Sequence, residues 1–216
     1  MFRNLIFDWS GTLVDDLGPV LDATNAVLVA YGREPMSRDE FRRHFRLPYV
    51  EFYEQFVPGV PIAELEDVFR PAFSASLSPV TVLPHAREKL EWCRRHGVRC
   101  GVLTSMDAEA FSGHLVEFEL GHLFEATYAG VLDKRTVIRD LLERHGLRPE
   151  ETAFVGDMTH DVVTARHGGV TSVAVLTGYT AAEALAESRP DLTVSDLKAL
   201  RELLDKGRRQ KMIPEE

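Results

Sequence analysis

A short apolar run that ends in a carboxylate lies almost at the N-terminus. Leu5–Phe7 precede Asp8, and Gly11 and Thr12 follow it. An apolar run closed by a glycine turn predicts a buried strand that leads into a loop. A carboxylate at the end of such a strand must be hydrogen-bonded, paired or metal-bound, because an isolated buried charge costs on the order of several kcal/mol. Asp8 is therefore either a turn or helix-cap residue or an active carboxylate, and the rest of the chain is needed to choose.

The stretch after this strand has helical patterns and no convincing strand. Apolar residues between 18 and 31 predict a first helix, and a capping box at Ser37 starts a second. Pro48 and Pro61 stand at first-turn positions of a third and a fourth helix. We therefore expect residues 17–79 to form an all-helical domain that is inserted just after the first strand.

The pattern changes near residue 80, where strands and helices begin to alternate. Further strands are expected at 98–104, 126–130, 152–155, 171–176 and 192–194. Helices are expected at 84–96, from 107, at 134–145, at 159–168, at 181–187 and at 197–204, followed by a charged tail that frays. Alternation with short turns predicts an α/β fold, in which a parallel sheet is covered by helices on both faces. Residues 1–16 and 80–216 would form this core domain.

Composition narrows the class of protein. A chain of 216 residues with 44% hydrophobic and 27% charged residues is typical of a globular protein. A net charge of −9 does not indicate a nucleic-acid-binding surface. The two cysteines, Cys93 and Cys100, have no metal-ligand spacing, and we expect them to be reduced core thiols. With no leader-like start and no apolar span of about 18 residues, we expect a cytoplasmic protein that does not bind a membrane.

In parallel α/β sheets, ligands bind outside the carboxyl ends of the strands. The residues expected at those ends combine carboxylates, hydroxyls and one cation. They are Asp8 with Ser10–Thr12, Thr104 with Ser105, Lys134, and Gly156 and Asp157 with Asp161. Because these ends share one edge of the sheet, we expect the side chains to converge there.

This combination suits the transfer of a phosphoryl group. Asp8 and Asp157 would form an oxygen site for Mg²⁺, which binds through one or two carboxylates plus waters and substrate phosphate. Asp161, four residues after Asp157, could be a ligand or hold one. Lys134 would balance these charges, and the Thr104 hydroxyl could donate to a phosphate oxygen. Asp8 could then act as a nucleophile that forms an aspartyl phosphate.

Four motifs in order resemble the haloacid dehalogenase (HAD) superfamily of hydrolases. They are Phe7–Asp15, Val102–Ser105, Lys134 and Val155–Asp161. The resemblance covers nearly the whole chain, and by texture it is nearest to the phosphoglycolate phosphatases. It implies a Rossmann-like sheet with strand order 3-2-1-4-5 and a helical cap domain. It also implies that the backbone carbonyl of Ser10 binds Mg²⁺ alongside the acidic residues, and we place Gly11, Thr12 and Ser105 among the substrate-binding residues.

Ser10 departs from the family pattern, because phosphatases of this family carry an Asp at that position. That Asp protonates the leaving alkoxide and later activates water, a contribution of about 10²–10⁴-fold. Phosphonatases resemble this motif but need a cap lysine, and 17–80 contains none. Dehalogenases lack the acidic fourth motif that Asp157 and Asp161 supply here. A weak or non-catalytic phosphate-binding protein is the third alternative.

Other groups could take over the missing acid–base role. The candidates are His44, Asp15 and Asp16. From the cluster of arginines in the cap we select Arg46, which precedes Pro48, as the residue that reaches the mouth of the site and holds an anionic substrate group.

The sequence thus predicts a Mg²⁺-dependent phosphatase that acts on a small phosphorylated metabolite. Asp8, Ser10, Thr104 and Lys134 are the expected catalytic residues. With Ser10 in place of the acid, leaving groups that need little protonation are favoured. We expect a monomer or a weak homodimer.

Overall fold

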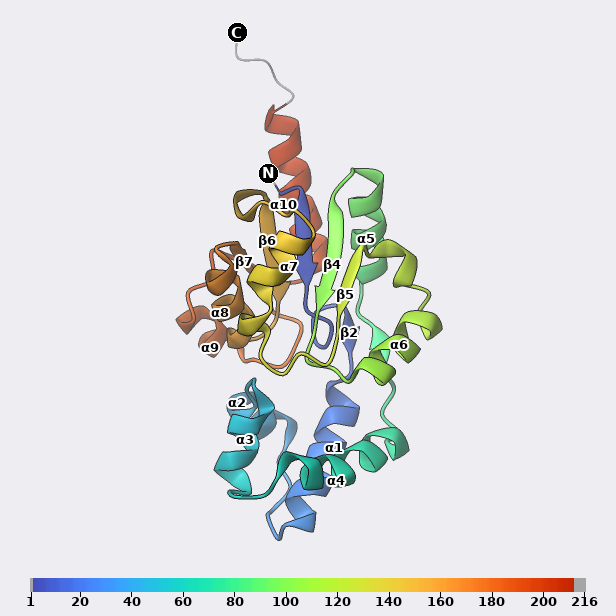
Figure 1. The fold of residues 1–216 in the computed structure, drawn as a ribbon, viewed down its shortest axis with the longest axis vertical. Coiled ribbons are helices and arrows are strands. Elements are labelled where there is room, and N and C mark those ends of the chain that lie inside the picture. The colour runs from blue at the N-terminus through green and yellow to red at the C-terminus, as the bar shows by residue number, and fades with distance from the viewer. Residues whose placement is uncertain (1, 212–216) are drawn as a thin grey trace.

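The structure is a computed structural model that describes residues 2–211, and its core is a six-stranded parallel sheet (Figure 1). The strands are β1 (Asn4–Phe7), β4 (Arg99–Leu103), β5 (Ala126–Tyr128), β6 (Thr152–Gly156), β7 (Thr171–Val175) and β8 (Leu192–Val194). Their order is β5-β4-β1-β6-β7-β8, and each neighbouring pair is parallel. The predicted order 3-2-1-4-5 is confirmed, with β8 as a sixth strand at the edge.

Both faces of this sheet are buried, as the continuous apolar run of β1 requires. Leu5 and Phe7 point into a core cluster that includes Leu90 and Leu200. Ile6 points to the opposite face and packs in a second cluster with Ile138. The covering helices are α5 (Ala86–Arg95), α6 (Ala108–Glu117), α7 (Ile138–Arg144), α8 (Thr159–Gly168), α9 (Ala182–Glu187) and α10 (Leu197–Lys211).

Two expectations about these helices need correction. The helix expected at 134–145 is divided into a 3-10 turn, η2 (Lys134–Thr136), and α7. Asp133 caps η2 by accepting a hydrogen bond from the backbone N–H of Arg135, so Lys134 lies in a tight turn beside the site. The last helix does not stop at 204 but continues to Lys211. The remaining 3-10 turns are η1 (Gly121–Leu123) and η3 (Pro149–Glu151).

The inserted segment consists of four helices below the carboxyl edge of the sheet in Figure 1. They are α1 (Leu17–Ala30), α2 (Arg38–His44), α3 (Tyr49–Phe56) and α4 (Ile62–Ala75); we call them the cap. The capping box at Ser37 is formed as predicted, with Glu40 as its partner. Val27, Phe52 and Leu65 belong to a separate apolar cluster inside the cap.

A short antiparallel ribbon joins the core to the cap. It pairs β2 (Val14–Asp15) with β3 (Thr81–Val82), the two passages of the chain between core and cap. The sequence does not predict this ribbon, because two residues per strand carry no readable alternation. Among the described residues, no helix combines the length and apolar content needed to cross a membrane.

Candidate active site

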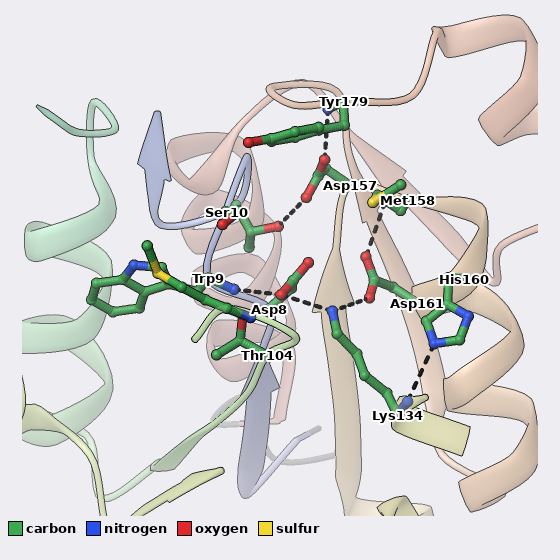
Figure 2. A network of polar contacts seen from close by, with 12 residues as sticks. Asp8, Trp9, Ser10, Thr104, Lys134, Asp157, Met158, His160, Asp161 and Tyr179 are labelled. Carbon is green, nitrogen blue, oxygen red and sulfur yellow. Dashed lines mark hydrogen bonds and ion pairs between the residues drawn. The ribbon is translucent and has the colours of Figure 1, made fainter. Parts of the chain in front are cut away.

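The predicted site residues gather at the carboxyl ends of β1, β4 and β6 (Figure 2). Above them, between core and cap, lies a pocket of about 730 Å³. Asp8 and Ser10 line it from the core side, and Leu65 and Phe69 line it from the cap side. The reacting group of a ligand in this pocket would therefore meet Asp8, while its body would meet the cap.

Asp8 is held rigidly by one of its two oxygens. Its Oδ1 accepts a hydrogen bond of 2.7 Å from the backbone N–H of Trp9 and lies 2.7 Å from Nζ of Lys134. Within residues 2–211, no hydrogen-bond partner is found for Asp8 Oδ2. Asp8 thus presents one fixed, unengaged carboxylate oxygen next to the pocket.

Lys134 is completely buried between two carboxylates. Its Nζ lies 2.7 Å from Asp8 Oδ1 and 2.8 Å from Asp161 Oδ1. Burial lowers the pKa of this ammonium, but the charges of Asp161 and Asp8 outweigh that effect and hold its pKa above the usual range. Lys134 is therefore a permanent cation that fixes Asp8 in place.

Asp161 is engaged through both oxygens. Oδ1 binds Lys134, and Oδ2 accepts a hydrogen bond from the backbone N–H of Met158 at the start of α8. This geometry supports the alternative that Asp161 positions other groups as well as facing the acidic cluster. Neighbouring His160 is buried, not exposed as its loop position had indicated, and its Nε2 accepts a hydrogen bond from the backbone N–H of Lys134.

Asp157 is positioned by groups from two distant loops. Its Oδ1 accepts a hydrogen bond from the Thr12 hydroxyl at 2.8 Å, and its Oδ2 accepts one from the backbone N–H of Tyr179 at 2.7 Å. Two glycines make room for it: a Cβ on Gly11 would lie 2.5 Å from Asp157 Oδ2, and one on Gly178 would lie 2.0 Å away. Gly11 and Thr12 therefore support Asp157; they do not line the pocket, which corrects their predicted role in substrate binding.

Three carboxylates and one ammonium leave this cluster with excess negative charge. Ligand oxygens of Asp8, Asp157 and Asp161 lie within 4.8 Å of one another, and all three residues are buried. Burial, followed among the raising effects by the charge of Asp161, raises the pKa of Asp8 to about 7. Burial and the charge of Asp8 raise the pKa of Asp157 well above its usual value. Such a set of crowded, hard oxygen donors fits a divalent cation like Mg²⁺.

Ser10 belongs to a second polar network on the other side of Asp8. Its hydroxyl donates a 2.6 Å hydrogen bond to Asp16 Oδ2, and the Tyr179 hydroxyl donates a 2.8 Å hydrogen bond to Asp16 Oδ1. Asp16 is buried, yet both Ser10 and Asp16 line the pocket. Burial raises the pKa of Asp16 to about 6, although the hydrogen bonds from Ser10 and Tyr179 oppose the shift. A carboxyl group thus stands one hydroxyl away from the position where the acid is missing.

The other two candidates for the acid–base role do not reach the pocket. His44 is exposed near the end of α2. The Asp15 carboxylate accepts a 3.3 Å hydrogen bond from the backbone N–H of Leu17 at the start of α1. Neither residue lines the pocket, so Asp16 is the candidate that the geometry favours.

Thr104 and Ser105 follow β4, next to β1 in the sheet. Thr104 is buried, and its Oγ1 accepts a 3.1 Å hydrogen bond from the backbone N–H of Met106, which leaves its own hydroxyl proton to donate. Ser105 is half-buried and lines the pocket. Figure 2 draws Thr104 beneath Asp8, in line with its predicted place at the strand ends.

The prediction that Arg46 reaches the mouth of the site is wrong in this structure. After α2 the chain becomes extended, and in extended backbone successive side chains point to opposite sides. Phe45 and Leu47 point into the pocket, whereas Arg46 is exposed and donates a hydrogen bond to Gln55.

The sequence analysis missed two residues that the structure brings to the pocket. Tyr179 lies in the loop after β7, so the rule that sites form at strand ends could have identified it. Arg70 of α4 lines the pocket from the cap and forms a 2.8 Å ion pair with Asp107 of the core. No local pattern marks Arg70, because its partner is 37 residues away.

Comparisons with known proteins agree with this geometry. The model of the haloacid dehalogenase-like hydrolase family matches residues 5–175. A phosphoglycolate phosphatase of Synechococcus elongatus is 30% identical over 200 residues, which cover 89% of this chain and 94% of that protein. Phosphoglycolate phosphatase 1 of Pseudomonas aeruginosa is 27% identical over 212 residues, which cover 92% of this chain and 78% of that protein. The crystal structure of a hydrolase from Pseudomonas syringae superposes with a TM-score of 0.81 at 18% identity, covering 94% of this chain and 98% of that one.

Proposed function

This chain belongs to the haloacid dehalogenase-like hydrolases, as its motifs predicted, and we propose that it is a phosphatase that hydrolyses a phosphate monoester through an aspartyl phosphate on Asp8. The observation that carries the proposal is the Asp8–Lys134–Asp161 ion-pair chain, with Asp8 Oδ2 facing the pocket. The similar proteins named phosphoglycolate phosphatases support the reaction class.

Asp8 and Asp157 would hold Mg²⁺, with Asp161 close by and the Ser10 carbonyl as a further expected ligand. When bound, the ion supplies positive charge that neutralises the transferring phosphoryl group. The chain's own residues supply the rest of the positioning. Lys134 prevents rotation of the Asp8 carboxylate, and the Thr12 hydroxyl and Tyr179 backbone N–H fix Asp157.

In the first step, Asp8 Oδ2 would attack the phosphorus atom, and the bond from phosphorus to the leaving oxygen would break. Oδ1 stays tied to Lys134 and to the Trp9 backbone, so the attacking oxygen needs little reorientation. The Thr104 hydroxyl is available to donate to a phosphate oxygen. Water would then attack the aspartyl phosphate, release inorganic phosphate and restore the Asp8 carboxylate.

The leaving oxygen needs a proton, and the Ser10–Asp16 pair can supply it. A proton on Asp16 would move to the Ser10 oxygen while the Ser10 proton moves to the departing oxygen, leaving Asp16 as a carboxylate. In the second step the same pair would accept a proton from the attacking water. The support is geometric: Ser10 and Asp16 are joined at 2.6 Å, and both line the pocket beside Asp8. The pocket-lining residues include no lysine that could serve a phosphonatase reaction.

Release of inorganic phosphate from p-nitrophenyl phosphate and acetyl phosphate tests the proposal. We expect turnover that requires Mg²⁺ and is lost in Asp8→Asn. Activity that survives Asp8→Asn would exclude Asp8 as the nucleophile. Asp16→Asn should slow alkyl phosphates by about 10²-fold or more but acetyl phosphate far less, because acetate leaves without a proton. Equal effects on both substrates would show that Asp16 does not handle the proton.

A further inference from the structure

The pocket above Asp8 is much larger than phosphoglycolate needs. Its volume of about 730 Å³ lies within the ~300–1,000 Å³ range of sites that enclose drug-sized ligands. Phosphoglycolate consists of two carbons, a phosphate and a carboxylate. Most of the pocket would remain empty of substrate if that compound were the ligand.

The cap wall of this pocket is apolar and partly aromatic. Its apolar residues include Phe45, Leu47, Leu65, Phe69, Phe73 and Met106. Phe69 and Phe73 stand four residues apart on α4, so they share one helix face, and their rings stack at a centroid distance of 6.0 Å. Both rings are half-buried. Covering them with an apolar part of a substrate would remove apolar surface from water on both partners, which favours binding.

The charges on the cap side of the pocket disfavour an anionic substrate body. Glu66, Asp107 and Glu109 line the pocket there, against the single cation Arg70. Arg70 already lies 2.8 Å from Asp107 and 3.2 Å from Glu66, and Glu66 also accepts a hydrogen bond from the Tyr49 hydroxyl. If Arg70 turned to a substrate carboxylate, two carboxylates that face the same pocket would lose their counter-ion.

We infer that the preferred substrate is a phosphate monoester with a bulky apolar body that carries no negative charge, such as an aromatic alcohol, and not phosphoglycolate. The body lies against Phe69 and Phe73 while the phosphate meets Asp8. This inference rests on the proposed phosphatase function and adds the chemical class of the leaving group. It also agrees with Ser10 in place of an acid, because aryl oxygens leave with less help from a proton than alkyl oxygens.

Substrate preference of the full-length enzyme with Mg²⁺ tests this inference. We expect kcat/KM for phenyl phosphate to exceed that for phosphoglycolate by at least about tenfold, with acetyl phosphate as a probe that lacks a body. A preference for phosphoglycolate would overturn the inference and leave the phosphatase function standing. No release of phosphate from any of the three compounds would overturn the proposed function, and the inference with it.

Two variants link that preference to the cap wall. Phe73→Ala should lower kcat/KM for phenyl phosphate by a larger factor than for acetyl phosphate; equal factors would contradict the assignment. Ser74→Arg places a cation on a residue that lines the pocket, and it should raise the phosphoglycolate-to-phenyl phosphate ratio several-fold. Ser112→Arg is the matched control, because Ser112 is exposed on α6 and does not line the pocket. A ratio that shifts equally in both arginine variants, or in neither, would also overturn the inference.

Discussion

Replacing Lys134 with methionine should destabilise the fold sharply, apart from any effect on catalysis. Lys134 is completely buried, and its Nζ lies 2.7 Å from Asp8 and 2.8 Å from Asp161. Methionine has a similar length but no charge, so the substitution leaves two buried carboxylates without their shared cation. Removing one partner of a buried ion pair costs about 3–5 kcal/mol.

That loss converts into a large change in melting temperature. For a domain of this size, each kcal/mol shifts Tm by about 2–4 °C, so we expect a decrease of roughly 6–20 °C. Mg²⁺ should recover part of the loss, because a ligand that binds only the folded state stabilises it by mass action. The recovery should exceed the shift that Mg²⁺ gives the wild type, since the variant carries one more uncompensated negative charge.

Differential scanning calorimetry at pH 7.5, first with EDTA and then with Mg²⁺, measures both effects. Lys198→Met is the matched control, because Lys198 is exposed at the start of α10; its change in stability should stay within about 0.5 kcal/mol. If Lys134→Met melts within about 2 °C of the control, with its slope fixed by chain length, Lys134 does not hold the two carboxylates as we describe.

Three further predictions concern the metal site and the proton route. Gly178→Ala should raise the Mg²⁺ concentration needed for half-maximal activity at least about tenfold, because the new Cβ would lie 2.0 Å from Asp157 Oδ2; Gly113→Ala, whose Cβ meets nothing within 4 Å, should not. EDTA should abolish phosphate release and added Mg²⁺ should restore it; turnover that is unaffected by EDTA would contradict a metal-dependent site. Tyr179→Phe removes the 2.8 Å hydrogen bond to Asp16 and should change kcat more for alkyl than for aryl phosphates, whereas an equal change would separate Tyr179 from the proton route.

Local sequence patterns were sufficient to predict most of the architecture. The capping box at Ser37 and the apolar run before Asp8 are short-range signals, and both elements form where expected. The strand order also follows, because connections in a parallel sheet obey strong geometric rules. The two-residue strands of the ribbon are too short to leave such a pattern.

The details of the site depend on contacts between distant segments, and these were harder to predict. Tyr179 meets Asp16 across 163 residues, so neither residue's role is visible locally. Arg46 shows the opposite error: its charge marked it as a ligand group, but the extended backbone after α2 turns it to solvent. A change of one position along an extended segment was enough to exchange Arg46 for Phe45 and Leu47 in the pocket.

The central claim is that Asp8 becomes phosphorylated during turnover. Acid quenching within milliseconds of mixing enzyme, Mg²⁺ and p-nitrophenyl phosphate, followed by peptide mass spectrometry, tests it directly. We predict one added phosphoryl group on the peptide that contains Asp8, and none in Asp8→Asn. A phosphoryl group on another residue, or rapid turnover with no trapped adduct on the Asp8 peptide, would contradict the account.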